Sequence, residues 1–142
     1  MSVDGANRVA EFKNLDTGAL SKVDFDLLHV VPPQTAPKFI RESSLAAENG
    51  WLDVNINTLQ HNKYPNIYGL GDVCNLPTAK TAAAVFTQAP VVAHNLEVAM
   101  GKEGKPAHYN GYSSCPLFTG DKKLMMIEFR YGGGSDETFY SD

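Results

Sequence analysis

The chain has 142 residues, of which 43% are hydrophobic and 20% are charged, and its formal net charge is −4. These values are typical of a soluble globular domain with a core, and they exclude the basic footprint of a nucleic-acid-binding protein. No apolar run approaches the roughly 20 residues that a membrane span needs. Two cysteines, Cys74 and Cys115, are too few for a disulfide framework.

The first part of the chain predicts β structure. Weak alternation of apolar and polar residues on either side of the turn cluster 14–18 predicts a hairpin over residues 8–25. The apolar run 26–31 predicts a buried strand that ends at Pro32, because proline cannot continue a ladder. His29 lies in this run and is interpreted as a core or edge histidine, since no partner at metal-binding spacing is near.

The middle of the chain is mainly a polar connection. A short helical turn is expected over Lys38–Glu42, and short strands are expected over residues 51–54 and 67–70. One long helix is predicted over residues 81–101. An apolar stripe is expected along it, at spacings of three and four residues: Ala82, Val85, Phe86, Ala89, Ala93 and Leu96.

Pro90 lies inside this predicted helix, where proline causes a kink or a local loss of hydrogen bonding. After the helix, residues 113–119 and 124–130 flank Gly120-Asp121 and predict a C-terminal hairpin with its turn at that dipeptide. The glycine-rich residues 131–135 and the acidic tail are expected to be flexible.

The rest of the chain is organised around residues 67–83. An apolar strand leads into Gly69-Leu70-Gly71-Asp72, and a polar turn then leads into the alanine-rich helix. This order is typical of a chain that brings its backbone close to a nucleotide-type cofactor and directs a helix N-terminus at it. Asp72 either caps the turn or binds a cofactor hydroxyl, and the helix behind it favours the second role. Lys80 opposes the helix dipole, which suggests that it faces an anion or an electron-rich ring, although a structural role stays open.

The two cysteines do not form a C-x-x-C motif, so no metal site is predicted. Cys74 follows the Gly-Asp turn and is interpreted as structural. Cys115 lies in Ser-Ser-Cys-Pro, where it is either a small buried residue or an exposed sulfur positioned by the following proline.

These segments together resemble one known family. Tyr64–Asp72 and Asn75–Val85, which includes Asn-Leu-Pro-Thr-x-Lys-Thr-Ala-Ala, resemble the C-terminal FAD-binding segment of the mitochondrial-type sulfide:quinone oxidoreductases. Tyr109–Gly120, which includes Ser-Cys-Pro-Leu, resembles their second redox-cysteine segment, and residues 29–33 and 50–61 are also similar. The Gly-Asp element is shared by many flavoprotein disulfide reductases, but the combination of motifs is specific.

The resemblance implies a flavin site and a sulfur site. Asp72 would hydrogen-bond the ribityl chain of FAD, and Lys80, Thr81, Ala82 and Ala83 would lie against the isoalloxazine ring. Cys115 would be one of two cysteines that take up sulfide sulfur as a persulfide and pass two electrons to FAD, after which a quinone is reduced. The implied partners are hydrogen sulfide, a quinone and a sulfur acceptor that is either a small thiol or sulfite.

The departures from the family are also informative. The family's Gly-x-Gly-x-x-Gly loop for the FAD diphosphate, its other redox cysteine and its C-terminal membrane-binding helices are not found in this sequence. We therefore expect a fragment: the end of a second, NAD-like nucleotide-binding domain (1–62), the C-terminal FAD-binding segment (63–106) and the redox-cysteine hairpin with its tail (107–142). The implied location of the whole protein is the mitochondrial inner membrane. The isolated chain is expected to bind FAD poorly and to be inactive.

The expected fold is α/β: a partial FAD/NAD(P)-binding, Rossmann-like flavoprotein fold with mixed strands around one long helix and a C-terminal β-hairpin. Two other functions stay open. One is a related flavoprotein quinone reductase similar to type II NADH dehydrogenases, which share the Gly-Asp element. The other is a non-catalytic fragment that assembles with a separate flavin-binding chain.

Overall fold

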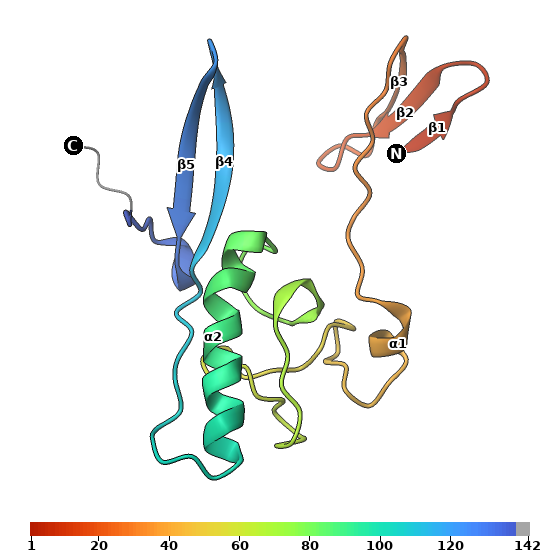
Figure 1. Ribbon diagram of the computed structural model, residues 1–142. Coiled ribbons are helices and arrows are strands. Elements are labelled where there is room, and N and C mark those ends of the chain that lie inside the picture. Colours follow the sequence, from red (N-terminus) through yellow and green to blue (C-terminus); the bar gives the residue numbers. More distant parts are fainter. Residues whose placement is uncertain (139–142) are drawn as a thin grey trace. The chain divides into compact units, whose positions relative to one another are not determined.

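The computed structural model describes residues 1–138 and contains two compact units, the first of which is residues 1–34 (Figure 1). This unit is an antiparallel sheet of β1 (Ser2–Asp4), β2 (Val9–Lys13) and β3 (Leu20–Asp24) in the order β1-β2-β3. Strands β2 and β3 pair from Val9↔Asp24 to Lys13↔Leu20, which confirms the predicted hairpin. Asn14 closes its turn by accepting two backbone N–H groups with its side-chain oxygen, each at 2.9 Å.

The predicted buried strand over residues 26–31 is wrong. The side chains of Leu27 and Val31 are 92% and 76% exposed, and no strand in the described residues pairs with this run. A strand needs a partner for its backbone groups as well as apolar side chains, and the ladder of β3 ends at Asp24. His29 is exposed, so its assignment to a core or edge strand is wrong as well.

The second unit begins at Thr35 and holds the motifs of interest. Its helical elements are α1 (Lys38–Arg41), the 3-10 turns η1 (Gly71–Val73) and η2 (Tyr131–Gly133), and the long helix α2 (Ala82–Ala99). Strands β4 (Ser113–Gly120) and β5 (Lys123–Phe129) form the C-terminal hairpin. The mixed α/β class with one long helix and a terminal hairpin is thereby confirmed.

The two short strands expected before α2 are wrong as ladders, because only isolated bridges form there. Leu52 pairs antiparallel with Ala46 and parallel with Cys74, and Tyr68 pairs with Gln60. The expected domain boundaries after residues 62 and 106 stay predictions.

Helix α2 confirms the predicted helix and runs without interruption through Pro90 (Figure 1). It begins after Thr81, whose side-chain oxygen accepts the N–H of Ala84 at 3.1 Å as an N-cap. It ends at Met100, and Gly101 follows in the left-handed region with φ +100°.

The apolar stripe predicted on α2 is not its buried face. Phe86 is 81% exposed and Leu96 is 39% exposed. The face that packs inward is instead partly polar and consists of Ala84, Gln88, Val92 and Asn95. The amides replace apolar side chains because the segments that cover α2 are loops with unpaired backbone groups. Asn95, for example, donates to the carbonyl oxygens of Thr58 and Ala107 at 2.9 and 3.1 Å.

The core of this unit consists of two small clusters. One is formed by Ile40, Leu52, Val54 and Cys74. The other is formed by Leu59, Val92 and Tyr109, and it joins α2 to the segments on either side of it. Loops that cross one another around these clusters therefore build most of the unit, while α2 is its one long regular element.

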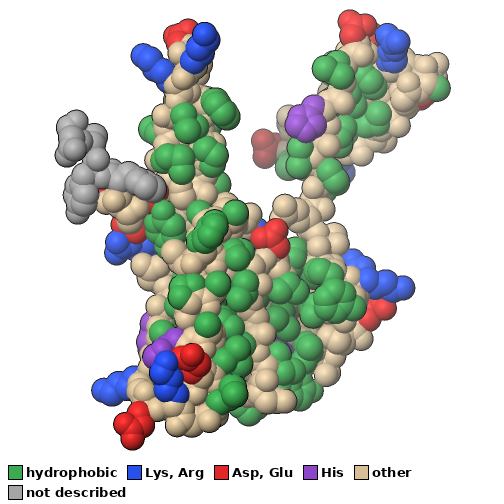
Figure 2. All heavy atoms as spheres, in the orientation of Figure 1, with side chains coloured by type: hydrophobic (Ala, Val, Ile, Leu, Met, Phe, Trp, Pro, Cys, Tyr) green, Lys and Arg blue, Asp and Glu red, His purple; other side chains and the backbone are tan. Residues whose placement is uncertain are grey.

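The predicted C-terminal hairpin is confirmed, with cross-strand pairs from Ser113↔Phe129 to Phe118↔Leu124. Its turn lies one residue later than expected, at Asp121-Lys122, where both φ angles are positive as in a type I′ turn. Exposed apolar side chains cover its outer half (Figure 2): Leu117, Phe118, Leu124, Met125 and Met126.

Residues 131–135, which we expected to be flexible, include η2 and a bridge from Phe129 to Ser135. The expectation for the rest of the tail falls partly on residues 139–142, outside the described residues. Within residues 1–138, no helix has the length and apolar character needed to cross a membrane.

Candidate functional site

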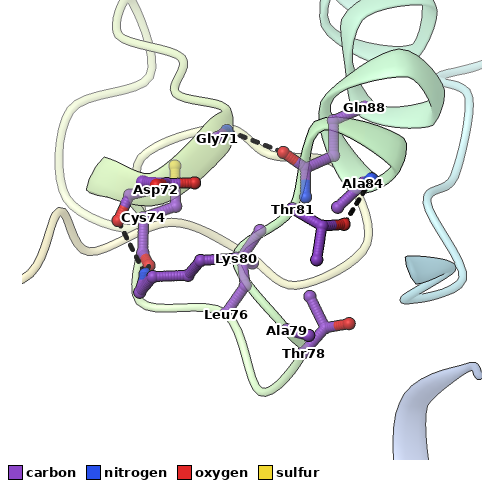
Figure 3. A pocket seen from close by; sticks show the side chains of 10 residues that line it. All are labelled: Gly71, Asp72, Cys74, Leu76, Thr78, Ala79, Lys80, Thr81, Ala84 and Gln88. Atoms are coloured by element: carbon purple, nitrogen blue, oxygen red, sulfur yellow. Dashed lines mark hydrogen bonds between the residues drawn. The ribbon is translucent and has the colours of Figure 1, made fainter. Parts of the chain in front are cut away.

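The Gly-x-Gly-Asp turn is held by its two glycines and by one residue of α2. Gly71 has φ +75°, which favours glycine, and its N–H donates to Oε1 of Gln88 at 2.7 Å (Figure 3). A Cβ atom at Gly69 would lie 2.2 Å from Cδ2 of Leu52 and 3.0 Å from Sγ of Cys74. The first glycine therefore permits close packing, and the second permits the turn that presents Asp72.

Lys80 holds the loop that follows this turn. Its Nζ donates to the backbone carbonyl oxygens of Asp72 and Cys74 at 2.6 and 2.8 Å (Figure 3). The same atom lies 3.9 Å from the ring centroid of Trp51, a cation–π distance. Burial lowers the pKa of Lys80, whereas the nearby Asp72 carboxylate acts in the opposite direction. The ammonium group thus has internal partners that explain a lysine before a helix start.

A narrow pocket lies between this loop and the start of α2 (Figure 3). Its lining combines the turn, the loop and the first helical turns: Gly71, Asp72, Cys74, Leu76, Thr78, Ala79, Lys80, Thr81, Ala84 and Gln88. Its interior has room for about one water molecule. A larger ligand would therefore lie on the outer surface of this junction.

That outer surface has the features of an anion-favouring site. Ala82 is exposed and Ala83 is half-buried, so only methyl groups flank the first turn of α2. The N-terminus of a helix of 18 residues has a partial positive charge and N–H groups without intrahelical partners. Asp72 is exposed on the loop that packs against this helix start. An exposed carboxylate, which can accept hydrogen bonds, and a helix N-terminus with unpaired N–H groups thus belong to one junction.

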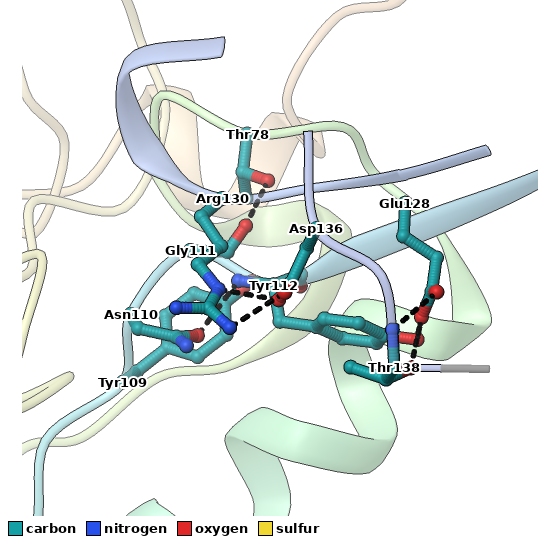
Figure 4. Close-up of polar contacts among 9 residues, drawn as sticks. All are labelled: Thr78, Tyr109, Asn110, Gly111, Tyr112, Glu128, Arg130, Asp136 and Thr138. Carbon is teal, nitrogen blue, oxygen red and sulfur yellow. Dashed lines mark hydrogen bonds and ion pairs between the residues drawn. The ribbon is translucent and has the colours of Figure 1, made fainter. Parts of the chain in front are cut away.

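Cys115 lies on strand β4, whose first residue contacts the same junction. It is a free, half-buried cysteine that pairs across the hairpin with Ile127. Ser113 precedes it by two residues and therefore lies on the same face of the strand. The Oγ atom of the buried Ser113 lies 2.8 Å from Oγ1 of Thr81, the N-cap of α2. One step earlier, Thr78 donates to the carbonyl oxygen of Gly111 at 2.7 Å (Figure 4).

Cys74 has the structural role that its position in the sequence suggested. It is fully buried in the cluster with Leu52 and Val54. Burial raises the pKa of its thiol to about 12, although the Lys80 ammonium acts in the opposite direction. Because the thiolate is the reactive form, Cys74 is unreactive near neutral pH.

A second polar cluster fixes the base of the hairpin (Figure 4). The buried Glu128 accepts hydrogen bonds from the Tyr112 hydroxyl at 2.5 Å and from the Thr138 N–H at 2.9 Å. The hydrogen bond to Glu128 raises the pKa of Tyr112. Arg130 pairs with Asp136, and its Nη2 lies 2.5 Å from the carboxylate. These contacts bind the segment after β5 to Glu128 of β5 and, through it, to Tyr112, which directly precedes the strand that contains Cys115.

Sequence reasoning missed Gln88, Ser113 and Glu128. The charge of Glu128 inside an apolar strand was a usable signal, because a buried carboxylate requires partners. Gln88 and Ser113 had no such signal, since both residue types are common on surfaces. Within residues 1–138, no cluster of three or more His, Cys, Asp or Glu side chains is arranged to hold a metal ion.

No family model matches the chain, but curated proteins and chains of solved structures do. Proteins named sulfide:quinone oxidoreductase, mitochondrial, are 45% identical over 139 residues in Schizosaccharomyces pombe and 42% identical over 134 residues in Mus musculus. These alignments cover 98% and 94% of this chain and 30% of each relative. The family resemblance is thereby confirmed, and the chain spans about 30% of the length of these relatives.

One of the similar solved structures has a title that names another assembly. It is a chain in the cryo-EM structure of the Tetrahymena thermophila mitochondrial ATP synthase, a composite F1Fo tetramer model. That chain is 38% identical with a TM-score of 0.83, and the match covers 95% of this chain and 32% of that one.

Proposed function

We propose that this chain, a relative of the mitochondrial sulfide:quinone oxidoreductases, provides the part of such an enzyme that contacts the ribityl and ring end of FAD and contains one redox cysteine. The observation that most supports this proposal is the hydroxyl contact between Ser113 and Thr81. It joins the strand of Cys115 to the helix start that the family resemblance assigns to the flavin. A flavin and a sulfur atom that exchange electrons must lie close together, and this contact supports the proposal because it ties the strand of Cys115 to that helix start.

The residues present fit FAD. The exposed Asp72 carboxylate can accept hydrogen bonds from ribityl hydroxyls, and the methyl side chains of Ala82 and Ala83 leave room for a flat ring. The N-terminus of α2, capped by Thr81, stabilises negative charge on a reduced ring. Lys80 acts indirectly, because its ammonium fixes the two carbonyl groups of the loop that presents Asp72. When bound, FAD supplies the acceptor for two electrons.

Cys115 is the proposed sulfur-handling residue. Hydrosulfide attacks a disulfide between Cys115 and a second cysteine, so that one S–S bond breaks and another forms as a persulfide, and a thiolate leaves. Once the persulfide sulfur has passed to a small thiol or sulfite, both cysteines are thiols, and re-forming their disulfide releases two electrons and two protons. These electrons would pass to bound FAD, and a quinone would be their final acceptor. Cys74 is buried in the core and cannot be the second cysteine, which would therefore come from outside this sequence. The proposed location is the mitochondrial inner membrane.

A chimeric enzyme tests this function. The corresponding segment of the Schizosaccharomyces pombe relative is replaced by this chain, and sulfide-dependent quinone reduction is measured. We expect activity in the chimera, a loss of at least about 100-fold in Cys115→Ser, and no comparable loss in the matched control Cys74→Ala. Asp72→Ala should reduce the flavin content of the purified chimera. A chimera that folds and binds flavin, and in which Cys115→Ser is as active as its parent, would contradict the proposal.

A second candidate function is favoured by the similar chain in the ATP synthase structure. In this alternative, the chain contributes the same fold to an inner-membrane assembly and performs no redox chemistry. Native electrophoresis of a tagged chain from mitochondria tests it. Migration in a large complex that Cys115→Ser and Asp72→Ala both leave unchanged would favour assembly, whereas a free chain or a flavin-dependent complex would exclude it.

A further inference from the structure

Three hydrogen bonds form a chain between α2 and β4. Oγ1 of Thr81 and Oγ of Ser113 lie 2.8 Å apart, and Ser113 donates to the carbonyl oxygen of Ala79 at 3.3 Å. Oγ1 of Thr81 also accepts the N–H of Ala84 at 3.1 Å. Ser113 is fully buried, so the hydroxyl groups have no access to bulk water at this end.

Each hydroxyl has one hydrogen to donate and can also accept. Ser113 has the Ala79 carbonyl oxygen and the Thr81 hydroxyl within reach, and either hydroxyl can donate in the contact between them. Thr81 also accepts the N–H of Ala84, so its oxygen links the helix to the strand. Such linked hydrogen bonds polarise one another and hold a more defined geometry than single ones.

We propose that Ser113 and Thr81 are positioning residues: their hydroxyl contact fixes the first residues of β4, and with them the backbone of Cys115, to the N-cap of α2. Ser113 and Cys115 share a face of β4, and two residues of a strand span about 6.6 Å. The hydroxyl pair thus fixes the strand at Ser113, two residues before Cys115. Its other member, Thr81, is the N-cap of α2. The role of Cys115 in this inference rests on the proposed function, but the restraint on its backbone is a property of the chain alone.

The test measures the alkylation rate of each cysteine in the 142-residue chain with iodoacetamide, followed by mass spectrometry. In Ser113→Ala we expect Cys115 to react about fivefold faster, the change in local opening that one neutral hydrogen bond contributes. Cys74 should keep its rate, because the core cluster around it stays closed. Thr81→Ser retains the hydroxyl and should leave the Cys115 rate within about twofold of the wild type.

The matched control is Ser114→Ala. Ser114 is the next residue and is also buried, but its Oγ has no hydrogen-bond partner among residues 1–138. Its removal should therefore leave the Cys115 rate unchanged. If Ser113→Ala and Ser114→Ala give the same rate, the proposal is overturned.

If Ser113→Ala raises the alkylation rates of Cys74 and Cys115 equally, that variant is unfolding as a whole. Thr81→Val, which lacks the hydroxyl, then decides: the proposal requires a faster rate at Cys115 and an unchanged rate at Cys74. A parallel rise there as well would overturn the positioning role. Because no flavin is present in this assay, its outcome is independent of whether the chimera oxidises sulfide.

Discussion

Gln88→Met should destabilise the chain by removing the acceptor that holds the Gly-x-Gly-Asp turn. Gln88 is 2% exposed, and its Oε1 accepts the N–H of Gly71 at 2.7 Å. Methionine has a similar shape but no comparable acceptor, so the Gly71 N–H would lose its partner. An unpaired buried donor costs about 1–3 kcal/mol. In a unit of about 100 residues, a loss near 2 kcal/mol lowers the melting temperature by roughly 8–16 °C.

Thermal and urea unfolding, both followed by far-UV circular dichroism, measure this effect. The matched control is Ala89→Met, which places the same side chain at the next, exposed position of α2 and should change the stability by no more than about 0.5 kcal/mol. If Gln88→Met is as stable as this control, the turn is not held by Gln88 and the reasoning fails.

Three further predictions concern the same junction. Gly69→Ala should cost about 1–3 kcal/mol because its Cβ has no space, whereas Gly134→Ala, with nothing within 4 Å, should be nearly neutral in the same urea assay. Lys80→Met should lower the free energy of unfolding by about 1 kcal/mol. It should also change the fluorescence of Trp51, the single tryptophan, and unchanged emission would refute the contact between the two side chains. The raised pKa of Cys74, about 12 against an ordinary 9.0, means that the unfolded chain loses this proton first, so stability should fall as pH rises from 9 towards 12. Cys74→Ala should show a smaller fall in urea unfolding above pH 9, and an equal fall would contradict the assignment.

Local patterns predicted the regular elements well. The alternating residues around 14–18, the alanine-rich run after Lys80 and the hairpin around residue 121 all depend on neighbours in the sequence. The failures have a common physical cause. The run 26–31 has strand-like residues but no partner strand among residues 1–138, and a partner is a property of the whole fold.

The prediction of which face of α2 is buried was wrong for a related reason. Hydrophobic periodicity predicted that the side of α2 with Phe86 is buried. The side with Gln88 is buried instead, because the loops that pack on the helix require hydrogen-bonding partners. The Gly-x-Gly-Asp turn and the helix start after it were predicted from the sequence, because glycine turns and helix starts have local signatures, whereas the roles of Asp72 and Cys115 stay predictions. The contact of Ser113 with Thr81 joins residues 32 positions apart and has no local signature.

The two amides on α2 have a mechanical consequence. A helix that packs through methyl and isobutyl groups can slide along its neighbours, and such shear is a common way for domains to move. A slide of α2 by one turn would move Gln88 and Asn95 by about 5.4 Å and break every hydrogen bond that they make. The helix therefore has a single packing position. We expect it to move as one rigid body with the turn at Gly71, the N-cap at Thr81 and the first residues of β4.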